Sequence, residues 1–219
     1  MMNPFEEKEV AENYDGWYQT KVGYIYDYLE KKTIANLLKH KKRGRMLEIG
    51  SGTGHWSRFF SKMGFEVIGV EKSKHMYDIS KRKRIKNANF LNEDIFNYNP
   101  DKKFDCAAFI TTLEFLENDK KAVNHVINLL ADNGFILFGV LNKNSFLGQQ
   151  RKKEKNIFTD ARFYTQDEIK EIFDPHGEIT IKTCAYPSPK FINYYAIIEL
   201  IKKMFNFKNG NFIAGRVDL

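Results

Sequence analysis

Two kinds of hydrophobic pattern alternate along the chain. Short runs of β-branched and aromatic residues, bounded by Gly and Asn, are typical of strands, and longer segments with apolar residues at helical spacing separate them. The strands are expected at Arg45–Ile49, Glu66–Glu71, Ala88–Leu91, Phe104–Ile110, Gly134–Leu141, Glu178–Tyr186 and Asn211–Val217. This alternation predicts an α/β fold with right-handed crossovers and a mostly parallel sheet that helices cover on both faces.

Start and stop signals mark several of the helices. Ser73 can cap a helix that runs through Lys81–Lys86, and Thr165 with Glu168 forms a capping box for a helix that Pro175 ends. Further helices are expected at Phe5–Asn13, Tyr24–His40, Asp119–Leu130 and Phe191–Phe205. Because residues 1–43 precede the first strand, they must lie across the sheet or its rim.

The composition suits one soluble globular domain. Hydrophobic residues make up 42% and charged residues 29% of the 219 residues, which argues against disorder. Cys106 and Cys184 form no C-x-x-C pair and the five histidines show no paired ligand spacing, so no metal is expected. The acidic N-terminus lacks an apolar signal segment and no apolar run can span a bilayer, so we expect a cytoplasmic protein without a membrane partner.

The net charge of +7 raises the question of an anionic partner. Basic runs occur at Lys81–Lys86 and Arg151–Lys155. Neither run carries the interleaved aromatic residues of a platform for single-stranded nucleic acid, which favours solvated surface over nucleic-acid or membrane binding. A small-molecule substrate is therefore expected.

A glycine-rich turn follows the first expected strand, where open α/β sheets bind ligands. Gly50, Gly52 and Gly54 allow a sharp turn, bring the backbone close to a ligand and lead into a helix that starts near His55. The spacing differs from the G-x-G-x-x-G of dinucleotide-binding proteins, and no P-loop Gly-Lys-Ser/Thr follows. Glu48, two residues before the first glycine, disfavours a pyrophosphate and favours a ligand with an ammonium and a sulfonium. Glu71, at the end of the second strand, is placed to accept hydrogen bonds from ribose hydroxyls.

These residues resemble the first motif and the ribose acid of the class I S-adenosylmethionine-dependent methyltransferases, within the small-molecule branch that includes enzymes of ubiquinone and menaquinone biosynthesis. The resemblance covers residues 14–173 and implies a Rossmann-like, seven-stranded sheet with a reversed last strand. It divides a single domain, residues 1–219, into a helical cap (1–43), a cofactor-binding core (44–141) and a substrate-side insertion with C-terminal strands (142–219).

The same resemblance implies roles for individual residues. Lys72 and Met76 would flank the adenine, Asp94 would accept from its amino group and Ile95 would pack beside the ring. The residues expected to bind S-adenosylmethionine, with S-adenosylhomocysteine as the product, are Tyr18, Glu48, Gly50, Ser51, Gly52, Thr53, Gly54, Trp56, Glu71, Lys72, Met76, Glu93, Asp94, Ile95 and Thr111.

Methyl transfer from a sulfonium is an in-line displacement that needs positioning more than a catalytic group. A base is required only if the acceptor must lose a proton, and His55 and Glu114 are the candidates. Two alternatives stay open: His55 merely opens its helix, and Glu114 contacts solvent or a basic neighbour. The N-terminal aromatic residues form either a lid, in which Tyr14 or Tyr18 contacts the cofactor, or the ordinary packing of a helix on the sheet.

Other functions compete with small-molecule methylation. An RNA- or DNA-modifying methyltransferase is supported only by the net charge. An NAD(P)-dependent oxidoreductase is disfavoured by the glycine spacing and Glu48, whereas a non-catalytic cofactor-binding module would keep the same motif. The pattern does not distinguish a monomer from a homodimer.

Overall fold

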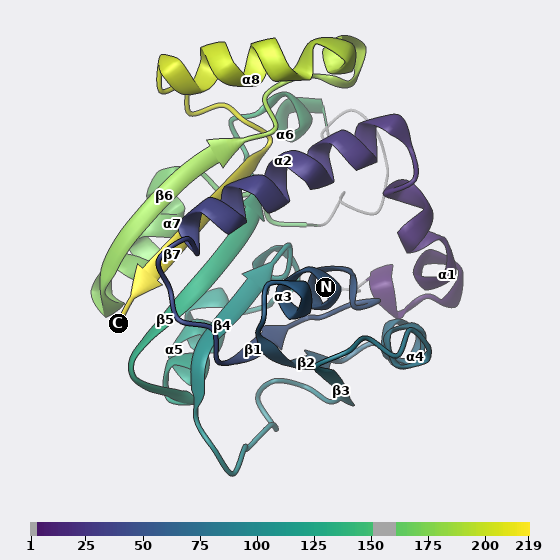
Figure 1. The fold of residues 1–219 in the computed structure, drawn as a ribbon, viewed down its shortest axis with the longest axis vertical. Helices are drawn as coiled ribbons and strands as arrows, with labels where there is room; N and C mark the ends of the chain where they lie inside the picture. The colour runs from purple at the N-terminus through teal and green to yellow at the C-terminus, as the bar shows by residue number, and fades with distance from the viewer. Residues whose placement is uncertain (1–3, 151–160) are drawn as a thin grey trace.

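A single seven-stranded sheet organises the protein (Figure 1). The computed structural model describes residues 4–150 and 161–219, and the expected basic run Arg151–Lys155 lies outside these residues. The strands are β1 (Arg45–Ile49), β2 (Glu66–Glu71), β3 (Ala88–Asn92), β4 (Phe104–Ile110), β5 (Leu130–Leu141), β6 (Glu178–Cys184) and β7 (Phe212–Asp218). Their order in the sheet is β3-β2-β1-β4-β5-β7-β6.

The first five strands are parallel, and β7 is reversed. β7 lies between β5 and β6 and runs antiparallel to both, with Ile136 and Ile179 each opposite Val217. This arrangement confirms the expected α/β class, the seven strands and the reversed last strand. β1 and β4 are neighbours although β2 and β3 separate them in sequence, so the order of strands reverses beside β1. Open α/β sheets bind ligands at such a point.

Helices cover both faces of the sheet, as expected. On one face α5 (Asp119–Ile127) and α7 (Gln166–Phe173) pack their apolar side chains on β1, β4 and β5. On the other face α2 (Lys21–Leu37) and α3 (His55–Lys62) contribute Ile34, Leu37, Trp56 and Phe60 to a second core cluster. The remaining helix beside the sheet, α4 (Lys74–Arg82), contacts β2 and β3.

The N-terminal segment lies across the rim of the sheet. A short 3₁₀ turn, η1 (Pro4–Glu6), and α1 (Lys8–Trp17) pack on α4, and α2 then crosses to β6 and β7 (Figure 1). Tyr26 fixes α2 to the C-terminal part of the chain, because its hydroxyl donates to the carbonyl of Pro187 and accepts from the Asn211 side chain. The segment thereby stands at the carboxyl ends of the central strands.

Several element boundaries differ from expectation. The expected helix Asp119–Leu130 stops at Ile127 because β5 begins at Leu130, and Asn133 lies inside that strand with a left-handed φ of 59°. The helix capped by Ser73 ends at Arg82, since the chain turns at Arg84 with a positive φ. The capping box of Thr165 and Glu168 is confirmed.

Two expected helices are divided. The expected helix Phe5–Asn13 is η1 followed by α1, which extends to Trp17. The expected helix Phe191–Phe205 consists of η4 (Pro189–Tyr194) and α8 (Tyr195–Met204), with a kink at Phe191. Three shorter elements complete the described chain: η2 (Leu113–Phe115), α6 (Phe146–Gln150) and η3 (Asp174–His176).

Helix α8 buries a charged side chain and exposes apolar ones, the reverse of the usual arrangement in a surface helix. Its one buried residue is Glu199, whereas Ile197, Leu200 and Met204 are 61%, 68% and 68% exposed. The helix lies at the edge of the molecule, beyond α2 and α6 (Figure 1). Within the described residues, no helix has the length and apolar character that crossing a bilayer requires.

Candidate active site

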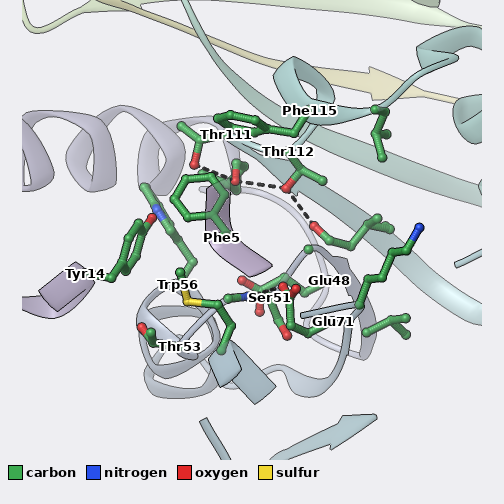
Figure 2. A pocket seen from close by; sticks show the side chains of 18 of the residues that line it. Phe5, Tyr14, Glu48, Ser51, Thr53, Trp56, Glu71, Thr111, Thr112 and Phe115 are labelled. Atoms are coloured by element: carbon green, nitrogen blue, oxygen red, sulfur yellow. Dashed lines mark hydrogen bonds between the residues drawn. The ribbon is translucent and has the colours of Figure 1, made fainter. Parts of the chain in front are cut away.

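A cavity of about 800 Å³ opens at the carboxyl ends of β1, β2 and β4. Its volume is in the range of small-molecule sites, which is roughly 300–1,000 Å³. All but one of the fifteen residues expected to bind the cofactor line it, the exception being Gly54. Figure 2 shows Glu48, Ser51 and Glu71 gathered on one side of the cavity and Thr111 and Phe115 on the other.

The glycine turn shapes the floor of this cavity. Gly50, Gly52 and Gly54 have φ values of 66°, 54° and 79°, a left-handed conformation that only glycine adopts without strain. A Cβ on Gly50 would lie 2.7 Å from Cγ2 of Thr112, whereas a Cβ on Gly52 would meet no atom within 4 Å. Gly50 is therefore required by packing, and Gly52 leaves open space on the ligand side of the turn.

Glu48 and Glu71 lie in one cavity, at the ends of neighbouring strands. Glu48 is 2% exposed, and its Oε2 accepts a hydrogen bond of 2.5 Å from the hydroxyl of Ser57 in α3. Burial raises the pKa of Glu48 to about 8. A cation in the cavity would favour the ionised form of this carboxyl, as the sequence argument requires.

The Glu71 carboxylate also organises the turn. Its Oε2 accepts from the backbone N–H of Gly52 at 2.8 Å and its Oε1 from the backbone N–H of Ser73 at 2.7 Å. Burial raises the pKa of Glu71, and these N–H groups partly offset that effect. Glu71 therefore connects the glycine turn to the start of α4.

The two hydroxyl side chains of the turn have different environments. Ser51 is 5% exposed, and its buried hydroxyl has no hydrogen-bond partner among the described residues. The hydroxyl of Thr53 donates to Asp15 at the end of α1, at 2.7 Å. The turn is thus joined to α1 through Thr53, whereas the side chain of Ser51 packs against Gly69 of β2.

The residues expected to flank the adenine lie in the cavity wall beside β2 and β3. Met76 and Ile95 are buried apolar side chains in its wall. Lys72 pairs with Asp94 at 3.2 Å, and the other oxygen of Asp94 accepts from the backbone N–H of Phe96. This arrangement offers an apolar slot with a carboxylate at its edge, together with Glu93.

Aromatic residues of the N-terminal segment roof the cavity. The ring of Tyr18 stacks on the imidazole of His55 with 3.6 Å between centroids, and the hydroxyls of Tyr14 and Tyr18 are 3.2 Å apart. Phe5 packs edge-on against Phe115, which follows β4, at 4.9 Å (Figure 2). Among the N-terminal aromatic residues, Tyr14, Trp17 and Tyr18 line this cavity, whereas Tyr24 and Tyr26 lie outside its wall.

The two candidate bases occupy different environments. Nε2 of His55, the first residue of α3, is 2.7 Å from Asp27 and 2.6 Å from Lys31, both in α2. With its proton this nitrogen donates to Asp27, and without it the nitrogen accepts from Lys31. Glu114 lies outside the cavity wall and is 1% exposed. Its Oε1 accepts from the backbone N–H of Leu141, and burial raises its pKa to about 8. His55 therefore supports the ring of Tyr18 at the cavity, and Glu114 connects the segment after β4 to the end of β5.

Glu30 of α2 is among the cavity residues that the sequence did not predict. The signal that could have found it is an acid on the apolar face of a helix, one turn after the buried Tyr26 and one turn before the buried Ile34. Because its role depends on how α2 crosses the sheet, the helical pattern alone does not reveal it.

Among the described residues, no cluster of His, Cys, Asp or Glu has the geometry of a metal site. The wall instead combines carboxylates, backbone N–H groups and aromatic faces. These groups suit an organic cation with hydroxyl groups and a flat ring.

Comparisons with known proteins agree on one family. The profile of a family described as "Methyltransferase domain" matches residues 19–177. An uncharacterized protein of Methanocaldococcus jannaschii is 34% identical over 185 residues, 83% of each chain. Malonyl-[acyl-carrier protein] O-methyltransferase 1 of Ilyobacter polytropus is 25% identical over 206 residues, 90% of this chain and 77% of its own. A Thermotoga maritima structure, described as an SAM-dependent methyltransferase and possible histamine N-methyltransferase, has a TM-score of 0.75, 22% identity and 96% coverage of both chains.

Proposed function

The chain belongs to the methyltransferase-domain family, and on that premise we propose that it transfers the methyl group of S-adenosylmethionine to a small-molecule acceptor in the 800 Å³ cavity. The observation that carries the proposal is the convergence of Glu48, Glu71 and the glycine turn on one cavity. The Rossmann-like sheet with its reversed last strand is the fold that the Thermotoga maritima methyltransferase shares.

The residues present fit S-adenosylmethionine. Open space lies where a Cβ of Gly52 would point, so the backbone of the turn is free to approach a ligand. Glu48 can attract a positive charge, Glu71 can accept from ribose hydroxyls, and Met76 with Ile95 forms an apolar slot for a flat ring. When bound, the cofactor supplies a methyl group on a sulfonium and its own leaving group.

The protein's contribution is to position and enclose the reactants. The backbone of residues 50–54 and the carboxylates would fix the nucleoside, and Tyr18 and Phe5 would cover it from the N-terminal side. Alignment of this kind supplies roughly 7–11 kcal/mol in favourable reactions. The faces of Tyr14, Tyr18 and Trp56 offer cation–π attraction of about 0.5–2 kcal/mol to a sulfonium. The structure thus supports a mechanism by proximity, orientation and exclusion of water.

The charge of the cavity favours a small molecule over nucleic acid. Carboxylates outnumber lysines in its wall, so a polyphosphate backbone would be repelled there although the whole protein is basic. The acceptor in this proposal is therefore neutral or cationic, handled by a single domain in the cytoplasm. The small-molecule acceptor distinguishes this protein from a DNA- or RNA-modifying methyltransferase.

Calorimetry tests the cofactor assignment. We expect S-adenosylmethionine and S-adenosylhomocysteine to bind with one site per chain, and NADH not to bind. Formation of S-adenosylhomocysteine with a panel of amine, hydroxyl and thiol acceptors then tests turnover. Binding of NADH in place of S-adenosylhomocysteine would overturn the proposal, and cofactor binding without turnover of any acceptor would leave the non-catalytic module as the better description.

A further inference from the structure

Glu30 differs from three other carboxylates of the cavity wall, those of Glu48, Glu71 and Asp94. Glu48 accepts from Ser57, Glu71 accepts from two backbone N–H groups, and Asp94 pairs with Lys72. Within the described part of the chain, no hydrogen bond or ion pair satisfies the carboxylate of Glu30.

The neighbours of Glu30 make an unpaired charge costly. The adjacent Lys31 directs its ammonium to Asp27 at 2.7 Å and to His55 at 2.6 Å. Burial, followed by the negative charge of Asp27 and of Glu114, raises the pKa of Glu30 to about 8. A positive group placed in the cavity would offset this cost by stabilising the ionised carboxylate.

The cavity as a whole is built for positive charge. Nine carboxylate residues and two lysines line it, although the protein carries a net charge of +7. Glu48 and Glu71 already have partners and proposed roles toward the nucleoside and its sulfonium. Glu30 approaches from α2, in the N-terminal segment, on the side where Tyr18 and Glu114 also lie. It therefore faces a part of the ligand space that the proposed nucleoside contacts do not explain.

We propose that Glu30 is the carboxylate that receives an ammonium group of a ligand bound in this cavity. The inference rests on the proposed function for the source of that ammonium, which is either the methionine part of the cofactor or an amine acceptor. With an amine acceptor, the Glu30 carboxylate takes one proton from R–NH₃⁺. The lone pair of the resulting R–NH₂ then forms the N–CH₃ bond as the S–CH₃ bond breaks, and the sulfur keeps that electron pair.

Two matched ligands separate the sources. S-adenosylhomocysteine keeps the α-ammonium and has no sulfonium charge, whereas 5′-methylthioadenosine has the same nucleoside without the amino-acid part. Calorimetry on the wild-type protein and on the Glu30→Gln and Glu30→Asp variants measures the affinity for each of these two ligands. The control is Glu9→Gln, an exposed carboxylate of α1 in the same wall. The possibility that an acceptor supplies the ammonium is tested on the S-adenosylhomocysteine complex. We compare the change in its melting temperature on adding phenethylamine with the change on adding 2-phenylethanol, a neutral analogue.

If the cofactor supplies the ammonium, Glu30→Gln weakens S-adenosylhomocysteine binding about tenfold, leaves 5′-methylthioadenosine unchanged, and Glu30→Asp recovers part of the loss. If the acceptor supplies it, S-adenosylhomocysteine affinity is unchanged and the shift by phenethylamine, absent with 2-phenylethanol, disappears in Glu30→Gln. Equal weakening of both nucleosides, or no change in any arm, overturns the role of Glu30. Failure of the wild-type protein to bind either nucleoside would instead overturn the proposed function.

A second, independent observation is the exposed apolar surface of α8, defined by Phe191, Tyr194, Ile197, Leu200, Ile201, Met204, Phe205 and Phe207. Contiguous apolar surface of this kind marks an interaction site in most proteins. Residues 189–208 contain four lysines and a single acidic residue, Glu199. Because Glu199 is buried and paired with Lys203, the exposed charge of this segment is positive. We infer that this surface lies on an anionic lipid bilayer, with its aromatic and aliphatic side chains in the headgroup region.

The charge pattern favours lipid over a second copy of this chain. A twofold contact through α8 would bring its lysines toward those of the other copy, whereas anionic headgroups complement them. The sequence taken alone favoured no membrane partner, because the exposure of these side chains depends on the inverted orientation of α8.

Co-sedimentation tests this surface. Vesicles of equal parts phosphatidylcholine and phosphatidylglycerol should pellet the wild-type protein, and phosphatidylcholine alone should not. Leu200→Ser combined with Ile197→Ser should reduce the pelleted fraction about fivefold or more, whereas Phe146→Ser, an exposed apolar residue of α6, should not. Absence of binding to the anionic vesicles overturns the inference. So does a concentration-dependent dimer in sedimentation velocity that the double substitution abolishes.

Discussion

The ring of Tyr18 lies flat on the imidazole of His55, with 3.6 Å between centroids and 9° between planes. Asp27 and Lys31 of α2 both lie within hydrogen-bonding distance of Nε2 of that imidazole, so α2 fixes the ring on which Tyr18 rests. The contact joins a residue just beyond α1 to the first residue of α3 and closes the cavity from the N-terminal side.

The ring of Tyr18 should contribute more to binding the charged cofactor than the uncharged product. We expect Tyr18→Ala to weaken the binding of S-adenosylmethionine by ~0.5–2 kcal/mol more than that of S-adenosylhomocysteine, because only the former carries the sulfonium charge. Tyr24→Ala is the control, since Tyr24 is 66% exposed and outside the cavity wall. Equal affinities in wild type and Tyr18→Ala, measured by calorimetry, would dispose of the lid.

Replacing Glu71 should impair binding more than folding. Glu71→Ala removes the expected partner of the ribose and the acceptor for the N–H of Gly52, so S-adenosylmethionine should bind at least about tenfold more weakly, ~1.4 kcal/mol. Glu66→Ala, at the exposed start of the same strand, is the matched control. An unchanged dissociation constant in Glu71→Ala would count against the ribose assignment.

Alanine substitutions at the glycines of the turn should affect two different quantities, the stability of the protein and its affinity for the cofactor. Gly50→Ala should lower the free energy of unfolding by about 1–2 kcal/mol or more, because it forces a left-handed alanine and a clash with Thr112. Gly52→Ala pays only the conformational cost but places a methyl group in the ligand space, so its larger effect should be on cofactor affinity. Gly16→Ala, within α1 and with nothing near its Cβ, should be neutral or stabilising. Denaturant unfolding and calorimetry together measure both effects.

The ligand-free protein should lose stability as the pH rises. Burial raises the pKa of Glu30, Glu48 and Glu114 from 4.5 to about 8, so the folded state binds protons more tightly than the unfolded chain. This contribution is fully present below the unfolded pKa and is lost as the pH passes through about 8. The melting temperature should therefore fall between about pH 6 and about pH 9, and Glu114→Gln should reduce the slope. A melting temperature that rises over this range would contradict the assignment.

Much of the fold was predictable because short-range signals and long-range packing agree. β1, β2 and β4 occupy the expected residues, since each is an apolar run that stops at glycine, an acid or a small polar residue. The capping box of Thr165 also acts locally. The start of β5 was not predictable, because Leu130 pairs with Phe104 through the sheet rather than through its own neighbours.

Some residues of the candidate site could also be predicted from local sequence, and others could not. The turn and Glu71 follow their strands directly in sequence, so the end of a strand predicts their place. Glu30 and the platform under Tyr18 depend on the path of α2 across the sheet, which no local pattern encodes. The expectation that Glu114 contacts solvent or a basic residue was likewise based on sequence neighbours. Its buried carboxylate bonds to the N–H of Leu141, which is 27 positions away.

The N-terminal residues that cover the cavity all lie within one stretch of the chain, from Phe5 to Glu30, that ends before β1 begins. The residues placed to hold the nucleoside come from a later stretch, β1 through β3. In evolution, a single recombination event upstream of Arg45 could exchange the whole cover and leave the nucleoside half intact. A chimera carrying the corresponding stretch of another family member is thus a direct route to new acceptor selectivity.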